Sequence, residues 1–176
     1  MSSENGANAK EVRLGDLYQE VILDHNRNPR NFKKIEGANA YAHGVNPLCG
    51  DDYHLYLYKD GNGVVRKVGF EGQGCAISKS SASMMTTMIE GKSLEEARRL
   101  KDSFIELLTK DETSEENKTK VGRLKIFQGV RQYPIRVKCA TLIWRALEEA
   151  LKNDSERKTQ VTTESDIGIQ QSENRN

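Results

Sequence analysis

Three cysteines are the residues of this 176-residue chain with the most distinctive chemistry. Cys49, Cys75 and Cys139 each stand at an expected boundary between elements, where a loop on a rigid scaffold presents a reactive or ligating thiol. Cys75 and Cys139 precede helical segments, and a helix N-terminus favours the thiolate, which is the nucleophile and the metal ligand. Any one of them taken alone is more simply a small buried hydrophobic residue.

The neighbours of Cys49 favour a metal site. In Cys49-Gly50-Asp51 the glycine permits a backbone conformation that turns a thiolate and a carboxylate toward one point, and both bind zinc. A turn or capping residue is the alternative role of Asp51. The long intervals between the cysteines are not those of a zinc finger, so spacing does not show that they meet. Three Cys and one Asp would complete tetrahedral zinc and leave no open position for water.

Composition excludes several classes of protein. Twenty-seven Lys and Arg against 26 Asp and Glu give a net charge of +1, so we expect no nucleic-acid partner. No run approaches the roughly 18 consecutive apolar residues of a membrane-spanning helix, so we expect no membrane partner. The first ten residues lack the apolar core of a secretory signal and the arginines of a transit peptide, which predicts a cytoplasmic protein with reduced thiols.

Hydrophobic periodicity predicts one helix followed by a hairpin. Apolar residues recur at helical spacing from Leu14 to Asn28, and Pro29 closes that segment. Residues 31–50 show no sustained period and read as irregular. Alternating residues 53–58 and 64–70 flank the turn-forming sequence Asp-Gly-Asn-Gly, which predicts a β-hairpin.

Helices are predicted for the rest of the ordered chain. They cover residues 76–90, 94–110 and 139–152, and Ser93 with Glu96 forms the pattern of a capping box at the start of the second. Residues 111–120 contain no large apolar side chain and read as a solvated loop.

This order of elements predicts an α+β fold, a small antiparallel β-sheet packed against several helices. One domain is expected from residue 11 to residue 152, after a flexible N-terminus at residues 1–10. Residues 153–176 carry too little apolar surface to offset the entropy of ordering, so we expect a disordered C-terminal tail.

Three motifs around the cysteines resemble a known family. They are Asn46-Pro47-Leu48-Cys49-Gly50-Asp51, Gly72-Gln73-Gly74-Cys75-Ala76-Ile77-Ser78 and Arg136-Val137-Lys138-Cys139-Ala140-Thr141-Leu142. Together they resemble the SufU-type proteins of iron-sulfur cluster assembly, relatives of the IscU and NifU scaffolds, over about residues 14–151. The resemblance implies a SufE/NifU-like fold.

The same resemblance implies a metal site that binds zinc. Its ligands would be Cys49, Asp51, Cys75 and Cys139. Two departures favour the SufU branch over IscU: Lys138 stands where IscU-type proteins carry a histidine, and their Leu-Pro-Pro-Val-Lys chaperone motif is absent from the sequence. The polar stretch at residues 111–120 also resembles the insertion of SufU-type members.

The function that the resemblance implies is zinc-dependent sulfur transfer. The protein would accept persulfide sulfur from a pyridoxal-phosphate (PLP)-dependent cysteine desulfurase of the SufS type and pass it to downstream iron-sulfur assembly proteins. Cys49 is the predicted acceptor, here called the catalytic cysteine, and Arg136 is predicted to bind the partner. Whether the chain itself counts as an enzyme, a sulfurtransferase, stays open.

Two alternatives remain. One is an iron-sulfur cluster scaffold that assembles and transfers a nascent cluster, with iron or an iron-sulfur cluster in place of zinc. The other is a plain interaction module with buried thiols. The histidines His25, His43 and His54 have no partner spacing in the sequence, so no ligand role is expected for them.

Overall fold

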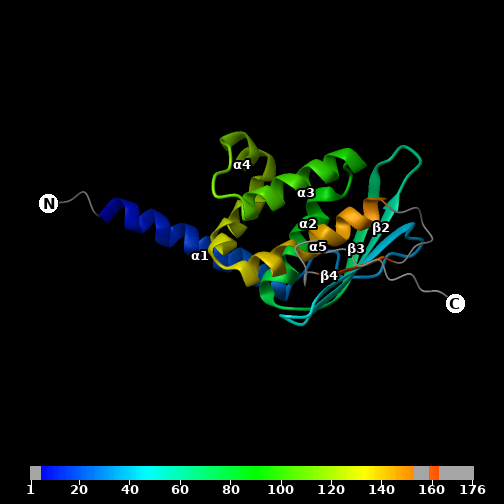
Figure 1. Cartoon of the computed structure of the whole chain (residues 1–176), viewed down its shortest axis with the longest axis horizontal. Coiled ribbons are helices and arrows are strands. Elements are labelled where there is room, and N and C mark those ends of the chain that lie inside the picture. The colour runs from blue at the N-terminus through cyan, green and yellow to red at the C-terminus, as the bar shows by residue number, and fades with distance from the viewer. Residues whose placement is uncertain (1–4, 153–158, 163–176) are drawn as a thin grey trace.

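The computed structural model describes residues 5–152 and 159–162, and it confirms the predicted α+β class. Its strands are β1 (Ala40–Asn46), β2 (Asp51–Lys59), β3 (Val65–Gln73) and β4 (Thr159–Thr162). Its helices are α1 (Asn5–Arg27), α2 (Ala76–Ile89), α3 (Leu94–Thr109), α4 (Glu115–Val121) and α5 (Pro134–Lys152), with the 3-10 segment η1 (Gly122–Gln132) before α5. Figure 1 shows the helices gathered on one side of the sheet.

The sheet has the strand order β3-β2-β1-β4. The predicted hairpin is confirmed as β2 and β3, and Asp60 Oδ1 accepts hydrogen bonds from the amides of Asn62 and Val64 in its turn. Strand β1 is antiparallel to β2 with His43 opposite His54, and β4 is parallel to β1.

Strand β1 was not predicted. Gly44 explains why the strand pattern was missed, and it also explains how β1 packs against a helix. A glycine weakens the strand pattern, but here it lets a helix approach the sheet closely. An added Cβ at Gly44 would lie 3.2 Å from Cδ1 of Leu142 and 3.6 Å from Cβ of Ala146. Helix α5 therefore packs directly on the backbone of β1.

One face of the sheet is buried and the other is partly open. Burial alternates along β1 and β2, so that Ala42, Leu55 and Leu57 face the helices. Behind them lies an aromatic cluster in which the Phe104 ring is 4.8 Å from that of Trp144 and 5.7 Å from that of Phe127, centroid to centroid. Helices α2 and α5 thus form the layer that covers the sheet.

Several predicted boundaries differ from the structure. Helix α1 begins at Asn5 rather than Leu14. Within residues 111–120, read as a loop, Ser114 caps α4 by accepting from the amide of Asn117. Helix α5 begins at Pro134, so Cys139 lies in its second turn and not at its N-terminus. The capping box of Ser93 on α3 is confirmed.

Of the N-terminus predicted to be flexible, residues 5–10 belong to α1. The rest of the predicted terminal segments, residues 1–4, 153–158 and 163–176, lies outside the described residues. Thr159–Thr162 is described and forms β4, which corrects the prediction of disorder for these four residues. Pairing with an open edge of β1 supplies backbone hydrogen bonds that the composition does not reveal. Among the described residues, no helix is both long enough and apolar enough to cross a membrane.

Gly69 in β3 gives a test of this packing. Its added Cβ would collide with the carbonyl oxygen of Lys33 and come within 2.8 Å of Cγ1 of Ile35. Gly69→Ala is therefore expected to lower the free energy of unfolding by about 1–3 kcal/mol, measured by urea denaturation. Gly61→Ala is the control, because nothing lies within 4 Å of its added Cβ. Equal losses for both variants would contradict the close approach of residues 33–35 to β3.

Candidate metal centre

Two segments far apart in the sequence meet at one cluster of thiols and a carboxylate. The Sγ atoms of Cys49 and Cys139 and a carboxylate oxygen of Asp51 all lie within 4.8 Å of one another. The two Sγ atoms are 3.2 Å apart, with the thiol of Cys139 donating to Cys49. Cysteine sulfur and carboxylate oxygen are both zinc ligands, so the cluster offers part of a metal-binding set.

Cys75 borders this cluster as the N-cap of α2. Its amide donates to Asp51 Oδ1 over 2.9 Å, and its Sγ accepts from the amide of Ser78 over 3.4 Å. The compact group of Cys49, Asp51 and Cys139 does not include Cys75, which therefore touches the site from one side.

The turn between β1 and β2 brings Cys49 and Asp51 together. Gly50 between them adopts φ +70°, a left-handed conformation that a glycine takes without strain, and the Cys49 amide donates to the carbonyl of Asn46. The glycine thus has the role that the sequence predicted for it. The first residue of β2, Asp51, then points to the helix side of the sheet.

Asp51 is a fully buried carboxylate. It accepts hydrogen bonds from the Cys75 amide, from Ser78 Oγ at 3.0 Å and from Asn46 Nδ2 at 3.3 Å. Over the described parts of the chain, no Lys, Arg or His forms an ion pair with it. A buried charge without an opposite charge is costly, so a cation fits beside this carboxylate.

Asn46 links the carboxylate to the thiols. Its Nδ2 donates to Asp51 Oδ2 and, at 3.6 Å, to Cys139 Sγ, while its Oδ1 is buried without a hydrogen-bond partner. The site therefore combines thiols, a carboxylate and an unpartnered buried amide oxygen. This donor set suits a bound zinc ion.

The pKa values of two of the thiols shift in opposite directions. The neighbouring Cys139 thiol and then the amide of Ser78 lower the pKa of Cys75 to about 6, although burial opposes them. The interaction with Cys75, followed by burial and by the hydrogen bond to Cys49, raises the pKa of Cys139. The thiolate is therefore favoured at Cys75 over Cys139.

Residues 17–160 match the protein family described as the NifU-like N terminal domain. This chain belongs to that family. The zinc-dependent sulfurtransferase SufU of Bacillus subtilis is 40% identical to it over 143 residues, which cover 81% of this chain and 95% of that protein. The iron-sulfur cluster assembly scaffold protein IscU of Streptococcus pyogenes is 37% identical over 143 residues, covering 81% of this chain and 87% of that protein.

A solved structure agrees with these relatives. The crystal structure of an iron-sulfur cluster assembly scaffold protein for the SUF system, from Fervidobacterium islandicum, has a TM-score of 0.70 and 36% identity. The match covers 75% of this chain and 94% of that one. The resemblance drawn from the three cysteine motifs and the fold that it implies are therefore confirmed.

Outside the cluster, Arg136 lies exposed near the start of α5, three residues before Cys139. Its guanidinium group stacks over the ring of Tyr133 at 4.5 Å from the ring centroid. Tyr133, Ile135 and, beside Cys49, Leu48 are all large exposed residues. This member of the NifU-like family thus exposes apolar and cationic side chains close in sequence to two of its cysteines.

Sequence reasoning missed two groups of residues. Asn46 and Ser78 lie within the quoted motifs, but nothing in the sequence showed that both would hydrogen-bond Asp51. His43 and His54 were given no partner, yet the pairing of β1 with β2 places them side by side on the open face of the sheet. His25 is buried, with Nδ1 2.7 Å from Ser83 Oγ.

The lowered pKa of Cys75 can be measured directly. In the reduced, metal-free protein, ultraviolet absorbance should record one thiolate that forms with an apparent pKa of about 6 as the pH rises. Cys75→Ser should remove this titration. Cys139→Ala should move it to higher pH, because the neighbouring thiol that lowers the pKa of Cys75 is gone. A titration near pH 6 that survives in Cys75→Ser would contradict the assignment.

Proposed function

We propose that this chain is a zinc-dependent sulfur-transfer protein of iron-sulfur cluster biogenesis. It accepts persulfide sulfur from a PLP-dependent cysteine desulfurase of the SufS type and passes that sulfur to downstream iron-sulfur assembly proteins. The observation that carries the proposal is the buried cluster of Cys49, Asp51 and Cys139 with Cys75 at its edge. The name of the SufU relative, a zinc-dependent sulfurtransferase, supports it.

In this proposal Cys49, Asp51, Cys75 and Cys139 hold the zinc ion. Bound zinc would keep its cysteine ligands deprotonated and order the segments that carry them. Asn46 and Ser78 orient Asp51 through their hydrogen bonds, as the partners of metal ligands commonly do.

Cys49 is the sulfur acceptor in this proposal because of its position. Cys139 is buried in α5 and Cys75 caps α2, whereas Cys49 is half-buried in the turn between β1 and β2. The neighbouring Leu48 is 64% exposed, so the partner can reach this turn. The Cys49 thiolate attacks the outer sulfur of the desulfurase persulfide, forming a new S–S bond while the old one breaks and the desulfurase cysteine leaves as a thiolate.

Docking of the desulfurase would use the surface around the thiols. Arg136, stacked on Tyr133, offers a cation and an aromatic ring in one rigid pair. Arginine and tyrosine are enriched among the residues that dominate binding at protein interfaces. The proposal therefore assigns partner binding to Arg136 and the sulfur to Cys49.

The acceptor assignment is tested by mapping the sulfur. After incubation with a SufS-type desulfurase and free cysteine, peptide mass spectrometry of the wild type should find one added sulfur atom on Cys49. Cys49→Ser should acquire none. Cys139→Ser is the matched control, since it also removes one thiol from the same cluster but keeps the acceptor. Sulfur found on Cys75 or Cys139 in the Cys49→Ser variant would refute the assignment.

The second candidate function is a scaffold that assembles and transfers an iron-sulfur cluster. The name of the IscU relative favours it, and thiolate-rich sites hold iron as well as zinc. Elemental analysis with an absorption spectrum of the anaerobically purified protein separates the two functions. Sulfur transfer predicts a tightly bound, colourless zinc ion. A brown protein with iron-thiolate charge-transfer bands would support the scaffold, and a protein without metal would contradict both.

A further inference from the structure

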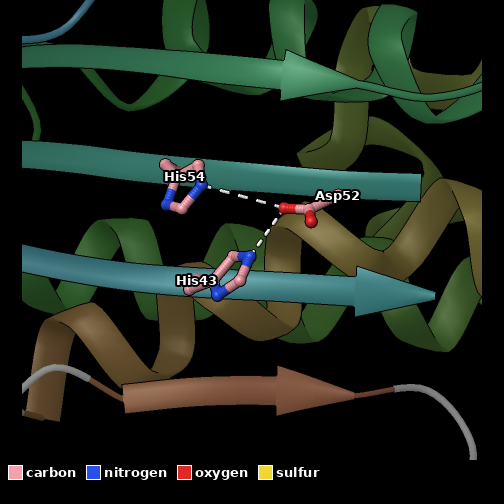
Figure 2. Close-up of side chains that lie close together, drawn as sticks. All are labelled: His43, Asp52 and His54. Atoms are coloured by element: carbon pink, nitrogen blue, oxygen red, sulfur yellow. Dashed lines mark hydrogen bonds and ion pairs between the residues drawn. The ribbon is translucent and has the colours of Figure 1, made fainter. Parts of the chain in front are cut away.

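A second group of metal-ligating side chains lies on the open face of the sheet. His43 on β1 is directly opposite His54 on β2, and Asp52 stands two residues before His54, so all three share one face. Figure 2 shows the two imidazole rings and the carboxylate directed toward one another across the two strands. The cysteine cluster plays no part in this arrangement, because Asp51 and Asp52 are consecutive and point to opposite faces.

The distances fit a shared ligand. Asp52 Oδ1 is 2.6 Å from His43 Nε2 and 3.8 Å from His54 Nε2, and one ligand atom from each residue lies within 4.8 Å of the others. The two rings stack with centroids 4.2 Å apart and an interplanar angle of 7°. Their side chains are 24% (His43), 36% (His54) and 46% (Asp52) exposed, so an ion can reach them from solvent.

A fourth residue orients one of the rings. The hydroxyl of Tyr41 lies 2.5 Å from Nδ1 of His54, and the two rings stack against each other. With Nδ1 as the donor to this hydroxyl, Nε2 of His54 keeps its lone pair facing Asp52. Metal-binding histidines are commonly fixed in this way, by a hydrogen bond from the other ring nitrogen. Burial also lowers the pKa of His54, which favours the neutral ring.

We propose that His43, Asp52 and His54 form a second metal site, which binds a divalent first-row transition metal such as Zn²⁺. Two imidazoles and one carboxylate are nitrogen and oxygen ligands, in contrast to the sulfur-rich cluster on the other face. Three ligands leave room for water, so the ion exchanges with solvent. On binding, the ion takes the place of the proton between His43 and Asp52, and that proton moves to Nδ1 of His43 or leaves to solvent.

The experiment counts metal ions in the reduced, full-length chain. After removal of metal with a chelator, the protein is dialysed against Zn²⁺ and its zinc content is measured per chain. The double variant His43→Ala/His54→Ala should bind one equivalent fewer than the wild type. The double variant Cys49→Ser/Cys139→Ser should retain that equivalent. Each site is thus removed by its own double variant. The zinc equivalent of the histidine site can therefore be present or absent whatever the cysteine site binds, which separates this inference from the proposed function.

Co²⁺ distinguishes the two sites by spectrum. The cysteine cluster should give intense thiolate-to-cobalt charge-transfer absorbance, whereas the histidine site should give weak visible bands and no charge transfer. The weak bands should disappear in His43→Ala/His54→Ala and persist in Cys49→Ser/Cys139→Ser. Equal metal content and equal spectra for wild type and the histidine variant would overturn the proposal.

A milder substitution keeps the test independent of folding. Tyr41→Phe removes the hydroxyl that holds His54 and should weaken binding of the second ion by about 10- to 100-fold. Tyr58→Phe is the matched control, because Tyr58 is an exposed residue on the same face of β2, four residues beyond His54. Equal affinities in the two variants would show that Tyr41 does not orient a metal ligand.

Discussion

The buried carboxylate of Asp51 is the constraint on which the arrangement of the metal centre depends. Asp51 is fully inaccessible to solvent, and hydrogen bonds from Asn46, Ser78 and the Cys75 amide hold it beside the thiols. Such a group is stable only when its hydrogen bonds are complete and a positive charge is available. Three elements must therefore lie next to this carboxylate: the β1–β2 turn, the start of α2 and the second turn of α5. The packing of the rest of the fold holds these three elements together.

Helices α2 and α5 are fixed to each other close to this point. The hydroxyl of Ser81 donates to the carbonyl of Ala140 over 2.6 Å and accepts from Nε1 of Trp144 over 3.0 Å. Both partners lie in α5, one of them immediately after Cys139. On the other side, Gly44 allows α5 to lie against β1. Packing between helices and sheet thus sets the relative positions of Cys75, Cys139 and Asp51.

The features that local sequence determines could be predicted, and the others could not. The β2–β3 hairpin and the Ser93 capping box depend on residues a few positions apart. Gly50 likewise indicated the approach of Cys49 to Asp51. The meeting of these residues with Cys139 depends on packing across the whole domain, so only the resemblance to a family indicated it. His43 and His54 were given no ligand role because β1 was not predicted, and without that strand there is no register to pair them.

The thiol cluster also sets a relation between metal binding and protons. The raised pKa of Cys139 keeps that thiol protonated, so the metal-free cluster holds fewer negative charges than its three sulfurs could carry. A divalent ion that takes up the cysteines as thiolates must displace the remaining protons. Metal affinity therefore falls as the pH falls, and it falls more steeply once Cys75 is protonated, below its pKa of about 6. The buried carboxylate thus favours a cation, and the protonation of the cysteines makes binding of that cation depend on pH.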